Sequence, residues 1–120
     1  MERAAAVRQI LVSLADGTRC LGAAVAARDG VPAVDVMTRP ASAESFCAMA
    51  AAALGAAEGA IQEWADERPE SATVDAGKLR LLVRALDARY ILVLMAALPG
   101  PSAMEVDLAV SRLKAILAAP

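Results

Sequence analysis

The chain has 120 residues, which is the usual length of one domain, and 58% of them are hydrophobic although only 2% are aromatic. Its 12 basic and 14 acidic residues give a net charge of −2 and are mixed along the chain, which excludes the strongly basic surface that nucleic acids and anionic membranes attract. Histidine is absent from the sequence, so the most usual general base and metal ligand is missing. We therefore expect a single domain over residues 1–120 that does not bind nucleic acid.

The beginning of the chain predicts a helix followed by a hairpin. Apolar residues at helical spacing indicate an amphipathic helix over residues 3–15. Two apolar runs, at 20–27 and 32–37, flank the dipeptide Asp29-Gly30, which is a strong hairpin signal and marks these two residues as a structural turn.

A long helix follows the hairpin. Ser42 is its expected N-cap, and the helix should run to about Trp64 or Glu67, before Pro69. Its longest charge-free part, residues 45–57, is shorter than the roughly 20 residues that a membrane span needs. We therefore expect no membrane insertion.

The second half of the chain predicts three strands and a last helix. The segment at 71–75 is short and weakly apolar, so it should be an edge strand, and longer strands are expected at 78–86 and 90–98. Ser102 and Glu105 have the spacing of a capping box, which places the start of the last helix.

These elements define the expected fold class. The runs at 20–27 and 90–98 are apolar throughout, so both strands should lie inside a sheet that is covered on its two faces. The sequence thus predicts an α/β (α+β) fold, a three-layer sandwich around a mostly antiparallel five-stranded sheet, in the order helix-strand-strand-helix-strand-strand-strand-helix.

The long helix has almost no polar face, which raises the question of what covers it. Its large apolar residues form one stripe, which we predict to be the core face: Phe46, Met49, Ala53, Leu54, Ala57, Ile61 and Trp64. Its small residues form the opposite stripe: Ala48, Ala52, Gly55 and Gly59. Each glycine costs the helix about 1 kcal/mol, and small residues allow a second helix to approach closely. The small stripe either reflects the alanine-rich composition or packs on a helix outside the domain, most simply that of a second copy.

The strand at 71–75 also favours contact with a second copy. The strand contains no lysine, which would discourage pairing with another chain, and an unpaired edge can accept another strand. We predict that its residues Ala72, Thr73, Val74 and Asp75 pair with a second copy, so that the two sheets merge and the long helices lie side by side.

The sequence contains no set of residues that predicts catalysis. There is no glycine-rich phosphate loop. Asp29, Asp35 and Asp87 are conceivable acids or metal ligands, but two of them, Asp29 and Asp87, lie at turns, where aspartate is expected to bond to the local backbone. Arg80 and Arg84 share one face of a strand, as a solvated pair or with internal ion-pair partners. Cys20 and Cys47 are not spaced as a redox or zinc pair and are typical of small buried residues in a reducing cytoplasm. We expect no catalytic residue, cofactor or metal.

The whole pattern resembles the Roadblock/LC7 family. The resemblance rests on the opening amphipathic helix, the segment GAAVAARDGVPAV, the long alanine-rich helix and the apolar strand beginning at Tyr90, and it extends from about Val7 to Leu117. It implies a five-stranded antiparallel sheet with one helix on one face and two on the other. It also implies a homodimer, or a heterodimer with a similar chain, joined through the third strand and the long helix.

The resemblance also implies a function. Members of this family regulate or anchor small Ras-like GTPases, or serve as subunits of dynein and of GTPase-anchoring complexes, and the family has no fixed catalytic residue. The expected function is therefore a non-catalytic, cytoplasmic, dimeric module that binds such a GTPase. Two alternatives stay open: a structural scaffold without a nucleotide-dependent partner, and a small-molecule sensor domain.

Overall fold

The computed structural model describes residues 2–16, 20–38 and 42–120. It contains the three helices and five strands predicted from the sequence, in the predicted order. They are α1 (Glu2–Ala15), β1 (Cys20–Ala27), β2 (Pro32–Met37), α2 (Ala43–Gln62), β3 (Ser71–Ala76), β4 (Leu79–Ala85), β5 (Tyr90–Ala97) and α3 (Ala103–Ala118).

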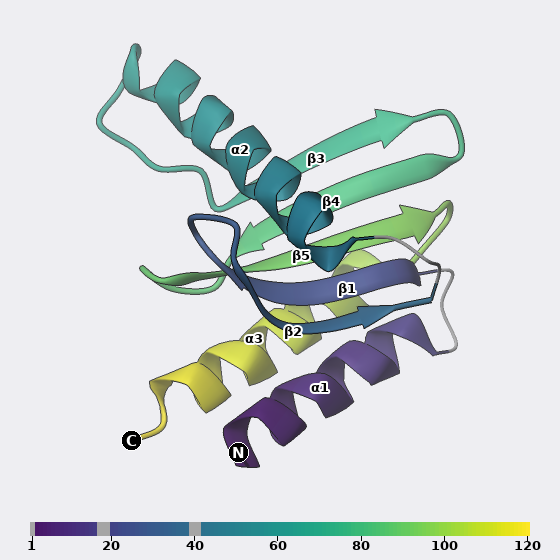
Figure 1. The fold of residues 1–120 in the computed structure, drawn as a ribbon. Helices are drawn as coiled ribbons and strands as arrows, with labels where there is room; N and C mark the ends of the chain where they lie inside the picture. Colours follow the sequence, from purple (N-terminus) through teal and green to yellow (C-terminus); the bar gives the residue numbers. More distant parts are fainter. Residues whose placement is uncertain (1, 17–19, 39–41) are drawn as a thin grey trace.

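The strands form one antiparallel sheet in the order β2-β1-β5-β4-β3. Helices α1 and α3 lie side by side on one face of the sheet, and α2 crosses the other face (Figure 1). This is the predicted three-layer arrangement, with β2 and β3 at the two edges. None of the helices in the described ranges is long and apolar enough to cross a membrane.

The central strands β1 and β5 are apolar throughout because each contributes to two cores. In β5, Leu92 and Leu94 pack beneath α1 and α3, whereas Ile91 and Val93 pack beneath α2. Side chains alternate between the two faces of a strand, so a strand covered on both faces has no polar position.

The two cores differ in the size of the side chains that fill them. The core beneath α1 and α3 contains the fully buried Leu11 and Leu113, whereas the core beneath α2 combines Cys47 and Ala50 with small residues of β1. Because small side chains meet on both sides, α2 can approach the sheet closely.

The chain ends meet on the α1/α3 side of the molecule. The Arg3 guanidinium donates a hydrogen bond to the carbonyl of Ala119, and both termini lie at the same end of the two helices (Figure 1).

The predicted core face of α2 is wrong in part: Leu54 is buried and Phe46 packs against the core beneath α2, but other members of the predicted face are exposed. Of the large residues assigned to it, Met49 is 70% exposed, Trp64 is 92% exposed and Ile61 is also exposed. The buried residues of α2 are Cys47, Ala50 and Leu54, so the buried face shares Leu54 with the predicted one but is otherwise made of smaller residues. The helix is rotated so that small residues face the sheet, because Ala24 and Ala26 of β1 leave room for a close approach.

The end of α2 has a different reason for its exposure. Figure 1 shows the C-terminal end of α2 extending beyond the β3 edge of the sheet. Ile61 and Trp64 belong to this end of the helix and to the residues just after it, and both are exposed. The helix itself ends at Gln62, slightly earlier than predicted.

Candidate protein-interaction surface

The side of α2 that faces away from the sheet forms an exposed surface without charge. We call it the outer face of α2, and it consists of Ala48, Met49, Ala52, Gly55, Ala56, Gly59 and Ala60, all of them exposed. Between Ser45 and Ile61 the only charged residue of the helix is Glu58, which is half-buried on the flank. Surface helices normally carry charged and polar residues on this side, so the outer face has the composition of a contact surface.

The two glycines of the outer face have no packing role within the chain. A Cβ placed on Gly55 or Gly59 would meet no atom within 4 Å. The opposite holds for Gly30, where a Cβ would lie 2.7 Å from the Cα of Ala48. Each glycine inside a helix costs about 1 kcal/mol relative to alanine. Nothing within the described chain offsets that cost at positions 55 and 59.

Strand β3 brings the second predicted contact element to the edge of the sheet. Its neighbour on one side is β4, and on the other side no strand is present among the described residues. Ala72 is half-buried against the core beneath α2, whereas Thr73, Val74 and Asp75 are exposed. The β3 edge can therefore accept a further strand.

The outer face and the β3 edge are neighbours in space. Ala51 of α2 and Ala72 of β3 pack against the same core cluster, so the helix lies directly above the edge strand. The structure thus places the C-terminal half of the helix stripe on the β3 side of the sheet, whereas Ala48 lies against the β1–β2 turn at the other edge. A single partner could contact the outer face and the β3 edge together.

Solved structures with the same architecture are known, although protein-family models and curated proteins give no match. A Roadblock/LC7 domain from Streptomyces avermitilis superposes with a TM-score of 0.82 at 17% identity, over 92% of this chain and 97% of that one. The gliding protein MglB from Thermus thermophilus gives 0.87 at 15% identity, over 97% and 91%. MglB from Myxococcus xanthus gives 0.86 at 13% identity, over 98% and 91%. The chain has the Roadblock/LC7 fold.

In this Roadblock/LC7 fold the end of α2 is a feature that the sequence analysis missed. The exposed Ile61 and Trp64 belong to it, and an acidic segment follows directly: Glu63, Asp66, Glu67 and Glu70. None of these four carboxylates forms a salt bridge within the part of the chain that the structure describes, whereas Glu58 pairs with Arg68 at 3.3 Å. The sequence signal that could have found this surface is the single tryptophan so close to the end of the helix.

The arginines of β4 are held within the domain. Arg80 forms a bidentate pair with Asp75, at 2.6 and 3.0 Å, and Arg84 lies 2.9 Å from Asp107 of α3. The hydrogen bond from Arg80 and its positive charge hold the pKa of Asp75 below the ordinary value. The sequence left open whether these arginines form a solvated pair or have ion-pair partners within the domain, and the structure shows the second.

The other polar candidates serve the backbone or lie in the core. The Asp29 carboxylate accepts from the Val31 N–H, and the Asp87 carboxylate accepts from the N–H groups of Arg89 and Tyr90. Both cysteines are buried, and burial raises the pKa of each thiol. No cluster of metal-ligating side chains occurs in the described ranges.

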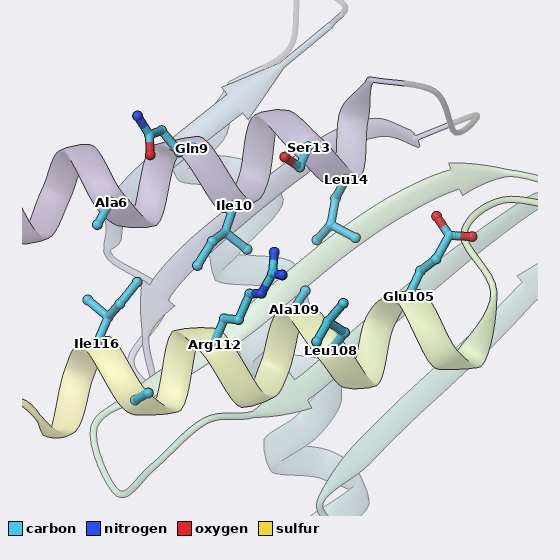
Figure 2. Close-up of a pocket in the computed structure, with 11 residues that line it drawn as sticks. Ala6, Gln9, Ile10, Ser13, Leu14, Glu105, Leu108, Ala109, Arg112 and Ile116 are labelled. Atoms are coloured by element: carbon cyan, nitrogen blue, oxygen red, sulfur yellow. The ribbon is translucent and has the colours of Figure 1, made fainter.

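A groove of about 550 Å³ lies on the opposite side of this Roadblock/LC7 fold, between α1 and α3. Figure 2 shows Ile10 and Leu14 pointing from α1 toward α3, and Arg112 pointing back toward α1. The charged groups of its lining are Arg112 and Glu105, and Glu105 is already engaged in the capping box with Ser102. A groove with so few convergent polar groups has little to orient a small ligand.

Proposed function

We propose that the chain is a dimeric interaction module that binds a small Ras-like GTPase and regulates or anchors it. It would act in the cytoplasm without catalysis of its own. The observation that carries the proposal is the uncharged outer face of α2, with two glycines unexplained by the chain itself, beside an unpaired strand edge.

The dimer is the first half of the proposal. A second copy is the simplest partner for a surface of this kind, because a twofold axis uses the same patch on both subunits. Pairing of the two β3 edges would extend the sheet, and close packing of the outer faces would explain Gly55 and Gly59. Self-association is also found among the similar structures, since one MglB structure has a tetrameric arrangement.

The GTPase is the second half, and it rests on the family resemblance of the sequence together with the shared fold. The described residues offer no metal cluster and no buried polar group that could support a reaction. Any effect on GTP hydrolysis would then come from the way the module holds the GTPase's own segments.

The test has two parts. Light scattering coupled to size exclusion gives the mass of the purified chain, and a dimer is expected. The tagged chain is then incubated with lysate of its source organism in excess of a non-hydrolysable GTP analogue or of GDP, and binding of any retained GTPase is measured again with purified protein.

Each outcome has a distinct meaning. Retention mainly in the GTP-like state supports a regulator, and equal retention in both states supports an anchoring scaffold. If no GTPase is retained in either state, the proposed partner is wrong. If the chain is a monomer at all concentrations, the proposed dimer is wrong.

A further inference from the structure

We propose that the projecting end of α2 reaches across to a second copy of the chain, where Trp64 packs on Val74 and Leu79 of that copy. This inference rests on the dimer proposed above and adds a contact that neither the small stripe nor the strand edge supplies. In this contact, the tryptophan of each subunit covers exposed apolar residues of the other subunit.

The first observation is the exposure of the tryptophan. Trp64 is 92% exposed at the end of a helix that extends beyond the sheet (Figure 1), with Ile61 exposed one turn earlier. A large aromatic side chain is costly to leave in water and is the residue type most often found at the centre of protein interfaces. Nothing in the described part of the chain covers it.

The second observation is an uncovered apolar area at the β3 edge. Val74 is 52% exposed and Leu79 is 39% exposed. Val74 lies on the α2 side of the sheet, because it pairs with Leu81, which packs beneath α2. Leu79 lies on the same side, because it stands two residues before Leu81 on β4, and side chains on a strand alternate between its faces. Helix α2 covers the other end of β3, at Ala72, and leaves this end open.

Antiparallel pairing of two β3 edges brings these two surfaces together. The twofold axis stands perpendicular to the merged sheet, so both α2 helices lie on the same side of it. The beginning of one β3 strand then lies beside the end of the other. Helix α2 crosses β3 near its beginning, at Ala72, and its C-terminal end extends beyond that edge (Figure 1), so in the merged sheet this end comes over the strand end of the second copy that carries Val74 and Leu79.

The charges near the edge indicate the register. Residues directly opposite in an antiparallel pair point to the same face, so the axis must pass through a residue and not between two. With the axis at Val74, the two Val74 side chains meet, and Glu70, just before one strand, comes to the same end of the pair as Lys78, which stands in the β3–β4 turn of the second copy. Neither Glu70 nor Lys78 has a salt bridge within the described residues. Opposite charges brought to the same end of the contact favour this arrangement over one that places like charges together.

The chain offers a direct probe, since Trp64 is its only tryptophan. Tryptophan emission and acrylamide quenching are measured over a dilution series of the full chain, alongside its mass. We expect the emission to move to shorter wavelength, and quenching to fall, over the same concentration range in which the mass doubles.

Two variants assign the shielding to the proposed contact. Leu79→Ser should weaken the dimer at least about tenfold and should make Trp64 more quenchable at a protein concentration where the variant is still dimeric. Leu108→Ser is the matched control, because Leu108 is 52% exposed on α3, on the opposite side of the sheet. Glu70→Lys and Lys78→Glu should each weaken the dimer, and their combination should restore it.

The outcomes separate this inference from the proposed function. A dimer whose Trp64 is quenched as freely as in the monomer overturns the contact and leaves the dimer intact. A dimer that shields Trp64 equally in Leu79→Ser also overturns it, because the tryptophan is then covered by another part of the dimer. A chain that stays monomeric overturns both.

Discussion

Gly30 lies against the backbone of α2, where an added Cβ would stand 2.7 Å from the Cα of Ala48. Its φ of 96° is also one that side chains rarely adopt. The β1–β2 turn and the second turn of α2 therefore lie in close backbone contact.

Gly30→Ala should destabilise the domain strongly for both reasons. Backbone strain of this kind costs on the order of 1–3 kcal/mol, and the clash with Ala48 adds to it. Gly77→Ala is the matched control, since Gly77 has a φ of 61° but a Cβ there would meet no atom within 4 Å. Urea unfolding of both variants measures the difference, and equal losses would show that the close approach to α2 contributes nothing.

The glycines of the outer face should behave in the opposite way. Gly55→Leu with Gly59→Leu should leave the domain folded, because both positions open into space, and should give monomers or a much weaker dimer. Ala4→Leu, at an exposed position of α1, serves as the control. An unchanged mass of the double variant by light scattering would remove these residues from the interface.

A smaller substitution distinguishes the effect of Gly59 on helix stability from its effect on the dimer interface. Gly59→Ala should raise the unfolding free energy of the monomer by roughly 0.5–1 kcal/mol, because alanine loses less conformational entropy in a helix. In the dimer the same change should raise the dissociation constant, since the added methyl group stands between the helices. Chemical unfolding at low and high protein concentration distinguishes the two effects.

The ion pair at the β3 edge predicts a pH dependence. Arg80 lowers the pKa of Asp75 in the folded chain, so the pair stabilises the fold fully above about pH 4, the ordinary value of an aspartate, and this contribution is lost as the pH falls through the lower folded value. Asp75→Asn should therefore be less stable than the parent at pH 7 and equally stable in strong acid. A difference that persists in acid would mean that the substitution acts through something other than charge. Because both side chains are in contact with solvent, added salt should also reduce the difference.

The buried cysteines predict slow thiol chemistry. Burial raises the pKa of Cys20 and of Cys47, and the negative charge of Asp35 adds to the effect at Cys47. Only the thiolate reacts, so alkylation at pH 8 should be slow in the folded chain and fast in denaturant. Mass spectrometry of peptides follows each thiol over time, and rapid labelling of Cys47 in the folded chain would show that α2 opens readily.

The sequence predicted the architecture because its signals are local. The apolar runs at 20–27 and 90–98, the Asp29-Gly30 turn and the capping box at Ser102 each depend on a few neighbouring residues. The structure contains the two strands and the helix cap where these signals place them, and it adds the contact of Gly30 with α2, which no local pattern contains.

The orientation of α2 was beyond such signals. Alanine occupies so much of this helix that its faces differ little in hydrophobicity, and the bulky Met49 and Trp64 suggested a core face that the structure does not have. The buried face is decided by the partner strand, where Ala24 and Ala26 accept Cys47 and Ala50. How far α2 extends beyond the sheet depends on the angle at which it crosses the strands, and the spacing of apolar residues in the sequence does not determine that angle.

The hydrogen bond between Arg3 and the Ala119 carbonyl has a practical meaning for experiments. Both ends of the chain emerge together, on the side of the sheet opposite α2 (Figure 1). A chain tethered to a sensor chip or a bead through either terminus would present α2 and β3 outward to the solution. In a twofold dimer formed through α2 and β3, all four termini would lie on the side of the sheet opposite α2. Any proteins fused to them would therefore be displayed on one face of the dimer.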